Sequence, residues 1–171
     1  MTKRFLFNWC VWIGLATGVY TVLYMLSPLS KYGVVYATFV ALPIFFISGA
    51  KRSEYINFAS SNICGVVWGW IYITLIVKMI GLGVNDIVAN GIVCGVITVV
   101  CCAFHFICTP NTPLNKLPAM FGGIAVCFST GATKIVPLMI TLVLGSTLAL
   151  ICQEGTHLLT EDGHWKFLAK K

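Results

Sequence analysis

Thiols and one imidazole gather near the end of an apolar stretch that contains the sequence CCAFHFIC. Cys94, Cys101, His105 and Cys108 follow one another at intervals of seven, four and three residues, which places them on one face of a helix. Thiolates and imidazole are ligands that suit copper or zinc. At a helical rise of about 1.5 Å per residue Cys94 lies about 21 Å from Cys108, so at most Cys101, His105 and Cys108 could share an ion.

A metal site is nevertheless the less favoured interpretation of this face. The chain has eight cysteines, and long helices align several of that many by chance. None of them forms a C-x-x-C pair, and cysteine inside an apolar stretch is usually a small buried hydrophobe. We therefore predict no cofactor and expect His105 to pack near the membrane surface with a hydrogen-bond partner. A metal-handling or redox protein stays as the alternative.

Carboxylates are scarce and badly placed for coupled transport or catalysis. The five acidic residues are Glu54, Asp86, Glu154, Glu161 and Asp162. All fall at the ends of apolar stretches or in the C-terminal tail, whereas an ion-coupled pump normally needs a carboxylate or similar relay inside the membrane. No phosphate loop or dinucleotide fingerprint is present either, so we expect passive conduction and no enzyme.

These side chains must be carried by membrane-spanning helices. Hydrophobic residues make up 58% of the 171 positions and charged residues 9%, whereas about a quarter of a soluble domain is charged. The mean hydropathy is +0.93. Such a chain needs the lipid bilayer as its solvent, and its continuous apolar runs predict α-helices rather than the alternating strands of a barrel.

Six apolar segments are predicted to cross the membrane as helices. They cover residues 6–26, 32–49, 55–77, 87–108, 118–130 and 136–152. The second and fifth are short for a span of about 20 residues. Residues 1–171 are predicted to form a single membrane domain, ending in a cytoplasmic interfacial tail over residues 154–171 that is anchored by Lys166, Lys170 and Lys171.

Positive charge predicts the orientation. With a cytoplasmic N-terminus and six spans, eight Lys and Arg residues lie on the cytoplasmic side and three on the other. The eight are Lys3, Arg4, Lys51, Arg52, Lys116, Lys166, Lys170 and Lys171, and the three are Lys31, Lys78 and Lys134. Both termini should be cytoplasmic. This orientation and attraction to anionic lipid explain the net charge of +6, so we expect no nucleic-acid partner.

The two halves of the chain resemble each other. A shift of 77 residues aligns GLATGVYTV with GIVCGVITV, and a shift of 82 aligns ATFVALPIFFISGA with AMFGGIAVCFSTGA, with five identities in each alignment. Three spans in each half require the second copy to enter the membrane from the opposite side. The pattern predicts two inverted repeats, about residues 6–77 and 87–153.

Matching short or interrupted segments in two such halves point to a site near the membrane midplane. Pro43 interrupts the second segment and costs it a backbone hydrogen bond, although a kinked helix packed against its neighbours is an equal alternative. Phe39 and Phe46 align with Phe121 and Phe128, so paired rings would border the site. The predicted pore or substrate residues are Phe39, Pro43, Phe46, Asn62, Pro118, Phe121, Phe128 and Thr130.

Small residues also repeat between the halves. Gly14 and Gly18 recur as Gly91 and Gly95. Glycines four residues apart allow close helix packing, which we expect here within the protomer or between copies of it. A non-conducting membrane scaffold, in which glycines only pack helices, is therefore a further alternative.

Two long stretches carry a resemblance to a known family. The segments YATFVALPIFFISGAKRSEYINFASSNICGVVWGW and LPAMFGGIAVCFSTGATKIVPLMITLVLGSTLALICQEG resemble the bacterial inner-membrane proteins grouped as domain of unknown function 1097. The resemblance covers about Gly14 to Glu154 and implies a multi-pass protein of the inner (plasma) membrane. Asn111 to Val126 is faintly similar to the Asn-Pro-Leu repeat of urea transporters, although Thr112 interrupts that motif here.

Together these observations predict an all-α membrane channel or facilitative transporter for a small neutral or weakly polar solute. The small size of the chain favours a homo-oligomer. The identity of the solute, the gating and the choice between channel and carrier stay open at this point.

Overall fold

The computed structural model describes residues 1–167, and over these residues the chain is all-helical. Its main helices are α1 (Lys3–Leu26), α2 (Thr38–Ile47), α3 (Tyr55–Gly81), α4 (Asp86–Ala103), α5 (Leu117–Ser129) and α6 (Ile135–Glu154). A π-helical turn, Phe104–Cys108, extends α4. The predicted anchors Lys170 and Lys171 lie outside the described residues.

The six helices correspond to the six predicted segments, with one difference. The second segment was expected from residue 32, but α2 begins at Thr38. Pro28 starts a short 3₁₀ turn that ends at Gly33, whose φ of 64° turns the chain in the left-handed region. A second 3₁₀ turn, Val35–Ala37, then leads into α2. The turns use the residues that the apolar pattern assigned to the helix.

Four of the helices are long and apolar enough to cross a membrane: α1, α3 with the turn before it, α4 with its π turn, and α6 with the turn after it. The chain is therefore a multi-pass membrane protein. In contrast, α2 and α5 have only 10 and 13 residues, so the prediction that the second and fifth segments are short is confirmed.

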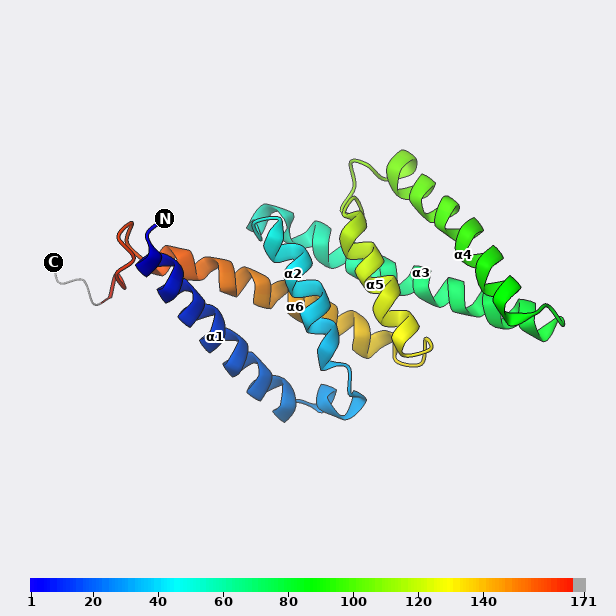
Figure 1. Ribbon diagram of the computed structural model, residues 1–171, viewed down its shortest axis with the longest axis horizontal. Coiled ribbons are helices and arrows are strands. Elements are labelled where there is room, and N and C mark those ends of the chain that lie inside the picture. The colour runs from blue at the N-terminus through cyan, green and yellow to red at the C-terminus, as the bar shows by residue number, and fades with distance from the viewer. Residues whose placement is uncertain (168–171) are drawn as a thin grey trace.

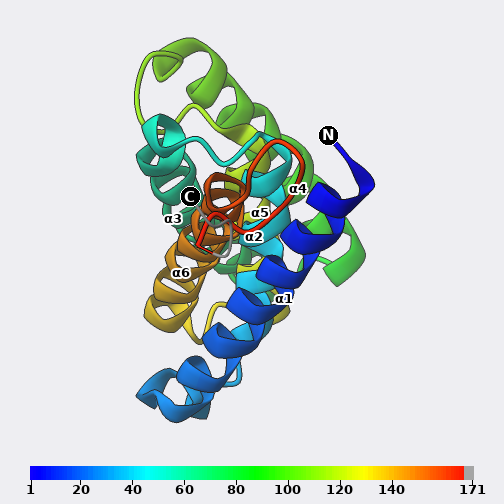
Figure 2. The same ribbon diagram turned by 90° about the vertical axis from the view of Figure 1, so that its left-hand side faces the viewer.

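The short helices lie at the centre of the molecule. In Figure 1, α2 and α5 cross the long α3 and α6, while α1 and α4 lie at opposite edges. Figure 2 gives the end view, in which α2 lies between α1 on one side and α3 and α6 on the other. The start of α1 contacts the segment after α6, because Asn8 Nδ2 donates to the Gly163 carbonyl at 2.8 Å.

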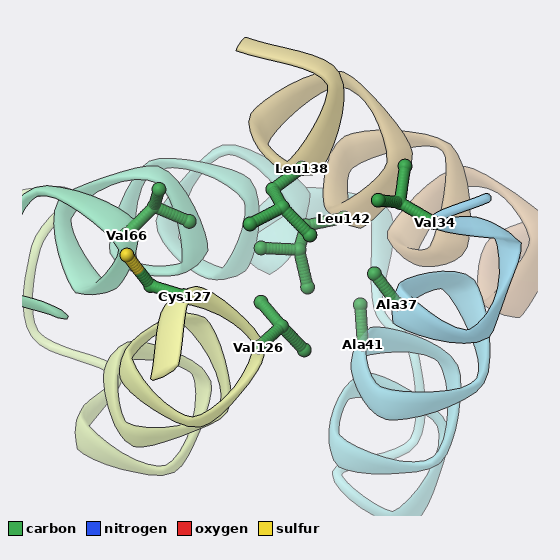
Figure 3. Packing of buried hydrophobic residues seen from close by; sticks show 8 residues of the cluster. All are labelled: Val34, Ala37, Ala41, Val66, Val126, Cys127, Leu138 and Leu142. Carbon is green, nitrogen blue, oxygen red and sulfur yellow. The ribbon is translucent and has the colours of Figure 1, made fainter. Parts of the chain in front are cut away.

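The centre of the protein is a cluster of apolar side chains contributed by α2, α3, α5 and α6 and by the turns before α2. Figure 3 shows these side chains pointing toward one another from the surrounding helices. The cluster comprises Val34, Ala37, Ala41, Val66, Val126, Cys127, Leu138 and Leu142. Val66 on α3 and Leu142 on α6 are both fully buried in it. The four inner helices thus pack as one unit.

Two glycines bring helix backbones into contact. A Cβ atom added to Gly65 of α3 would lie 1.9 Å from the Met120 carbonyl oxygen of α5. One added to Gly145 of α6 would lie 2.5 Å from the Thr38 carbonyl oxygen of α2. Because no side chain larger than hydrogen fits at either place, these glycines set the spacing between the short and long helices.

The two short helices also end alike. The residue after each terminal glycine is an alanine with positive φ, 40° at Ala50 and 58° at Ala132. Ala50 N–H donates to the Phe45 carbonyl and Ala132 N–H to the Cys127 carbonyl, each at 3.1 Å. No other non-glycine residue among residues 1–167 has a positive φ. The matching sequence ends therefore form matching helix caps.

Candidate functional site

Asn62 is the polar side chain most deeply placed in the helix core. It lies on α3, is fully buried, and its Nδ2 donates to Ser146 Oγ of α6 at 3.2 Å. The Ser146 hydroxyl donates in turn to the Leu142 carbonyl oxygen at 3.2 Å. With the hydroxyl proton of Ser146 used there, its oxygen accepts from the Asn62 amide.

Among residues 1–167, Asn62 Oδ1 then has no hydrogen-bond partner. Oδ1 lies 3.8 Å from the position that a Cβ atom would occupy on Gly122 of α5. The same position is 2.8 Å from Ile44 Cδ1 and 3.4 Å from Val40 Cγ1, both on α2. A buried acceptor thus faces the place where the two short helices meet α3. A group of this kind in a native structure usually has a functional explanation.

Other buried polar groups in the core are satisfied. The Tyr24 and Thr141 hydroxyls are 2.8 Å apart and link α1 to α6. The Tyr20 hydroxyl is hydrogen-bonded to Thr38 Oγ1 on α2. These pairs attach α1 to the inner helices and leave no free group for a ligand. Among residues 1–167, Asn62 Oδ1 is the buried side-chain nitrogen or oxygen without a partner.

The segment between α4 and α5 folds against the start of α3 near Asn62. Ser61 Oγ accepts from the Lys116 backbone N–H at 3.1 Å, and Lys116 Nζ lies 2.7 Å from Glu54 Oε1. His105 Nδ1 is 2.7 Å from the Leu114 carbonyl oxygen. The proline-rich stretch is thus an ordered cover over this end of α3.

The Cys and His face does not assemble as three ligands. His105 is buried, and its Nε2 accepts from Trp68 Nε1 at 3.2 Å while Nδ1 donates to Leu114. Both ring nitrogens are therefore engaged, and His105 has the hydrogen-bond partner that the sequence predicted. Cys101 is buried with its Sγ 3.3 Å from Met120 Sδ, whereas Cys108 is exposed. Over the described part of the chain, no three His, Cys, Asp or Glu side chains are grouped to hold a metal ion.

The aromatic residues predicted to border a site are less buried than Asn62. Phe39 and Phe121 lie at matching places on α2 and α5 and are 45% and 40% exposed. Phe46 packs on Trp9 with ring centroids 5.5 Å apart, and Phe128 packs on Tyr72 at 5.8 Å. The four rings thus lie around the short helices and do not form one buried cluster.

The remaining predicted residues lie at helix surfaces or ends. Pro43 is exposed within α2, which stays helical through it, and Pro118 is exposed in the first turn of α5. The Thr130 hydroxyl donates to the Cys127 carbonyl at 3.0 Å and so caps α5. The sequence singled out neither Gly122 nor Ser146 as a site residue. The adjacent glycines Gly122 and Gly123 inside a short apolar segment were the sequence signal that could have drawn attention to Gly122.

Larger hollows lie elsewhere, at the ends of the helices. One of about 570 Å³ is lined by residues that include Lys31 and Lys134, and one of about 730 Å³ by residues that include Arg52. Both are open surface features beside charged residues. They are separate from Asn62 and contain none of the predicted pore residues.

Comparison with known proteins places the chain in one family. The model of the family described as "Protein of unknown function (DUF1097)" matches residues 10–157, which is most of the chain. The chain belongs to this family. No curated protein and no solved structure matches it.

Proposed function

We propose that this protein is a channel or facilitative transporter, and not an enzyme, that passes a small neutral or weakly polar solute across the bilayer. The observation that carries the proposal is the unpartnered, fully buried Asn62 Oδ1 at the meeting point of α2, α3 and α5. A polar group held inside a membrane protein without a structural partner is costly, and such groups usually mark a ligand or solute path.

The proposal includes an inverted repeat in which α1–α3 correspond to α4–α6. Gly65 contacts Met120 and Gly145 contacts Thr38. In the proposed repeat, residues 80 apart correspond on the long helices, as Gly65 does to Gly145. Residues 82 apart correspond on the short helices, as Thr38 does to Met120. The contact of Gly65 with Met120 is then the counterpart of the contact of Gly145 with Thr38. A half-turn in the plane of Figure 1 brings α1–α3 approximately onto α4–α6. The two short helices would then complete six membrane-crossing segments around a central site.

The charge pattern supports a neutral solute. Glu54 is paired with Lys116 and Glu154 with Arg52, each pair at 2.7 Å and near a helix end. No acidic residue of the chain lies in the middle of an apolar segment. A cation passing the centre would lack the carboxylate that normally compensates its desolvation. The faint similarity of Asn111 to Val126 to urea transporters agrees with a neutral solute.

We also propose that both termini face the cytoplasm and that the protein acts as a homo-oligomer in the inner membrane. Gly14 and Gly18 on α1, and Gly91 and Gly95 on α4, have no atom of the protein within 4 Å of an added Cβ. Their faces are thus open to a neighbouring copy, as expected for membrane helices that associate through small residues.

Reporter fusions test the orientation. A fusion after Lys51, between α2 and α3, should report the cytoplasm, and one after Gly83, between α3 and α4, should report the opposite side. The excess of Lys and Arg on one set of loops is the physical reason. If both fusions report the same side, the inverted repeat and the six-segment topology are wrong.

Solute flux tests the function. Proteoliposomes that contain the full chain should swell in response to at least one solute from a panel of urea-like, amine-like and short amide compounds, faster than protein-free vesicles. Phe39→Ala and Phe121→Ala should change the rate or the selectivity more than the yield of folded protein. A panel without any flux would favour the non-conducting scaffold.

A further inference from the structure

We infer that the solute is a small neutral hydrogen-bond donor, carrying an N–H or O–H group that binds Asn62 Oδ1. This inference rests on the proposed transport function and specifies its solute class. Primary amides are the simplest members of the class.

The free atom defines the chemistry. Asn62 Nδ2 and Ser146 Oγ are used in the chain of hydrogen bonds that ends at the Leu142 carbonyl. What the protein leaves free is an acceptor, Asn62 Oδ1, so the complementary ligand must donate. A solute with acceptors only would leave this buried oxygen unpaired, and sites built around a hydrogen bond discriminate strongly against ligands that lack it.

The surroundings define the size and charge. Val40 and Ile44 supply apolar walls from α2, and Gly122 presents no side chain from α5. The carboxylates Glu54 and Glu154 are each already paired with a basic side chain. An amide oxygen between apolar walls offers a partner to a neutral donor and little compensation to a desolvated cation. A Cβ atom on Gly122 would lie only 2.8 Å from Ile44 Cδ1, so the solute must displace the end of the flexible Ile44 side chain to reach Oδ1. This requirement favours a molecule of a few heavy atoms with one donor group.

Acetamide and acetone form a matched pair of probes, because they have the same number of heavy atoms and the same carbonyl but only acetamide donates. We expect acetamide to raise the unfolding midpoint of the purified full chain in detergent, and an equal concentration of acetone to leave it unchanged. In proteoliposomes acetamide should enter faster than through protein-free membranes. Equal stabilisation by the two probes would overturn the inference.

Two variants test the atom and the space in front of it. Asn62→Leu removes the acceptor, and Gly122→Ala keeps the acceptor but adds a methyl group 2.8 Å from Ile44 Cδ1, which hinders the displacement of Ile44 that the solute needs. Each should abolish the acetamide-dependent shift and lower acetamide flux about tenfold, the factor that corresponds to one neutral hydrogen bond. Ser60→Ala changes a half-buried polar residue two positions before Asn62 on α3; it is the control and should keep both signals.

The outcomes separate the two claims. If acetamide flux persists unchanged in folded Asn62→Leu and Gly122→Ala, transport stands and the Asn62 site is wrong. If acetamide stabilises the wild type and not the variants, but no solute of the panel crosses, the donor site stands and transport is wrong. If neither binding nor flux is seen, both are wrong. Circular dichroism and the unfolding midpoint without solute establish that each variant is folded.

Discussion

Two pairs of side chains lie where α3 meets α6 and would be equivalent in the proposed repeat, but they differ in chemistry. Asn62 and Ser146 form a hydrogen-bonded polar pair, whereas Val66 and Leu142 lie together in the apolar cluster of Figure 3. Asn62 and Leu142 are 80 positions apart, as are Val66 and Ser146. The same separation relates Gly65, which brings α3 against α5, to Gly145, which brings α6 against α2.

The apolar pair indicates what this packing requires for stability alone. Val66 and Leu142 are fully buried and need no hydrogen bonds. The polar pair is also fully buried but carries an amide oxygen with no protein partner, which typically costs about 1–3 kcal/mol. In the proposed repeat leucine and valine fill the equivalent places, so this packing does not itself require a polar pair, which agrees with the proposed role of Asn62 in binding a solute.

The largest effect should come from separating α3 from α5, whose contact at Gly65 corresponds in the proposed repeat to the contact of α6 with α2 at Gly145. Gly65→Ala would place a Cβ atom 1.9 Å from a backbone oxygen of α5, which forces the helices apart. We expect the free energy of unfolding to fall by about 3 kcal/mol, at the upper end for overpacked cores. Denaturant titration in micelles, followed by tryptophan fluorescence, measures the change.

Two matched variants calibrate this result. Gly145→Ala meets backbone at 2.5 Å and should cost somewhat less than Gly65→Ala, while Gly81→Ala, with no neighbour within 4 Å, should be nearly neutral. A loss at Gly65 no greater than that at Gly81 would mean that α3 and α5 are not in backbone contact.

Moving the polar group to the apolar side should have the next largest effect. Leu142→Asn buries an amide among Val66, Leu138 and Val126, which offer no hydrogen-bond partners from their side chains. We expect a loss of about 2 kcal/mol in the free energy of unfolding. Leu142→Met, which conserves volume, should cost less than about 1.5 kcal/mol. Equal losses in the two variants would remove the contrast between the pairs.

The helices could be predicted from sequence because the bilayer imposes long apolar runs separated by short polar turns. The beginning of α2 could not, because the apolar pattern continues through residues 32–37 while Pro28 and Gly33 set up 3₁₀ turns that depend on local backbone geometry. The short lengths of α2 and α5 were visible in the sequence as shortened apolar runs.

The candidate site was only partly accessible from sequence. Asn62 stood out as a polar residue within an apolar run. Its hydrogen bond to Ser146 and the position of its buried Oδ1 beside Gly122 depend on how three helices pack. Likewise, the helical face that joins Cys101 with His105 was visible, but the Trp68 bond that occupies the second nitrogen of His105 comes from another helix.

The smallest change in stability should come from the contacts that attach the outer helices, α1 and α4, to the inner ones. These two contacts also differ in chemistry. Tyr24 of α1 and Cys101 of α4 are 77 positions apart and both buried, but Tyr24 donates or accepts a hydrogen bond with Thr141 while Cys101 lies against Met120 Sδ. Tyr24→Phe leaves the Thr141 hydroxyl unpaired, so we expect the free energy of unfolding to fall by about 1 kcal/mol. Tyr36→Phe is the control, because its hydroxyl bonds Ser129 at an exposed position and its loss should be close to neutral. If the two variants behave alike, the hydroxyl pair does not attach α1 to α6. The hydrogen bonds that the indole N–H groups of Trp9 and Trp12 donate to carbonyls at the end of α6 would then be the attachment.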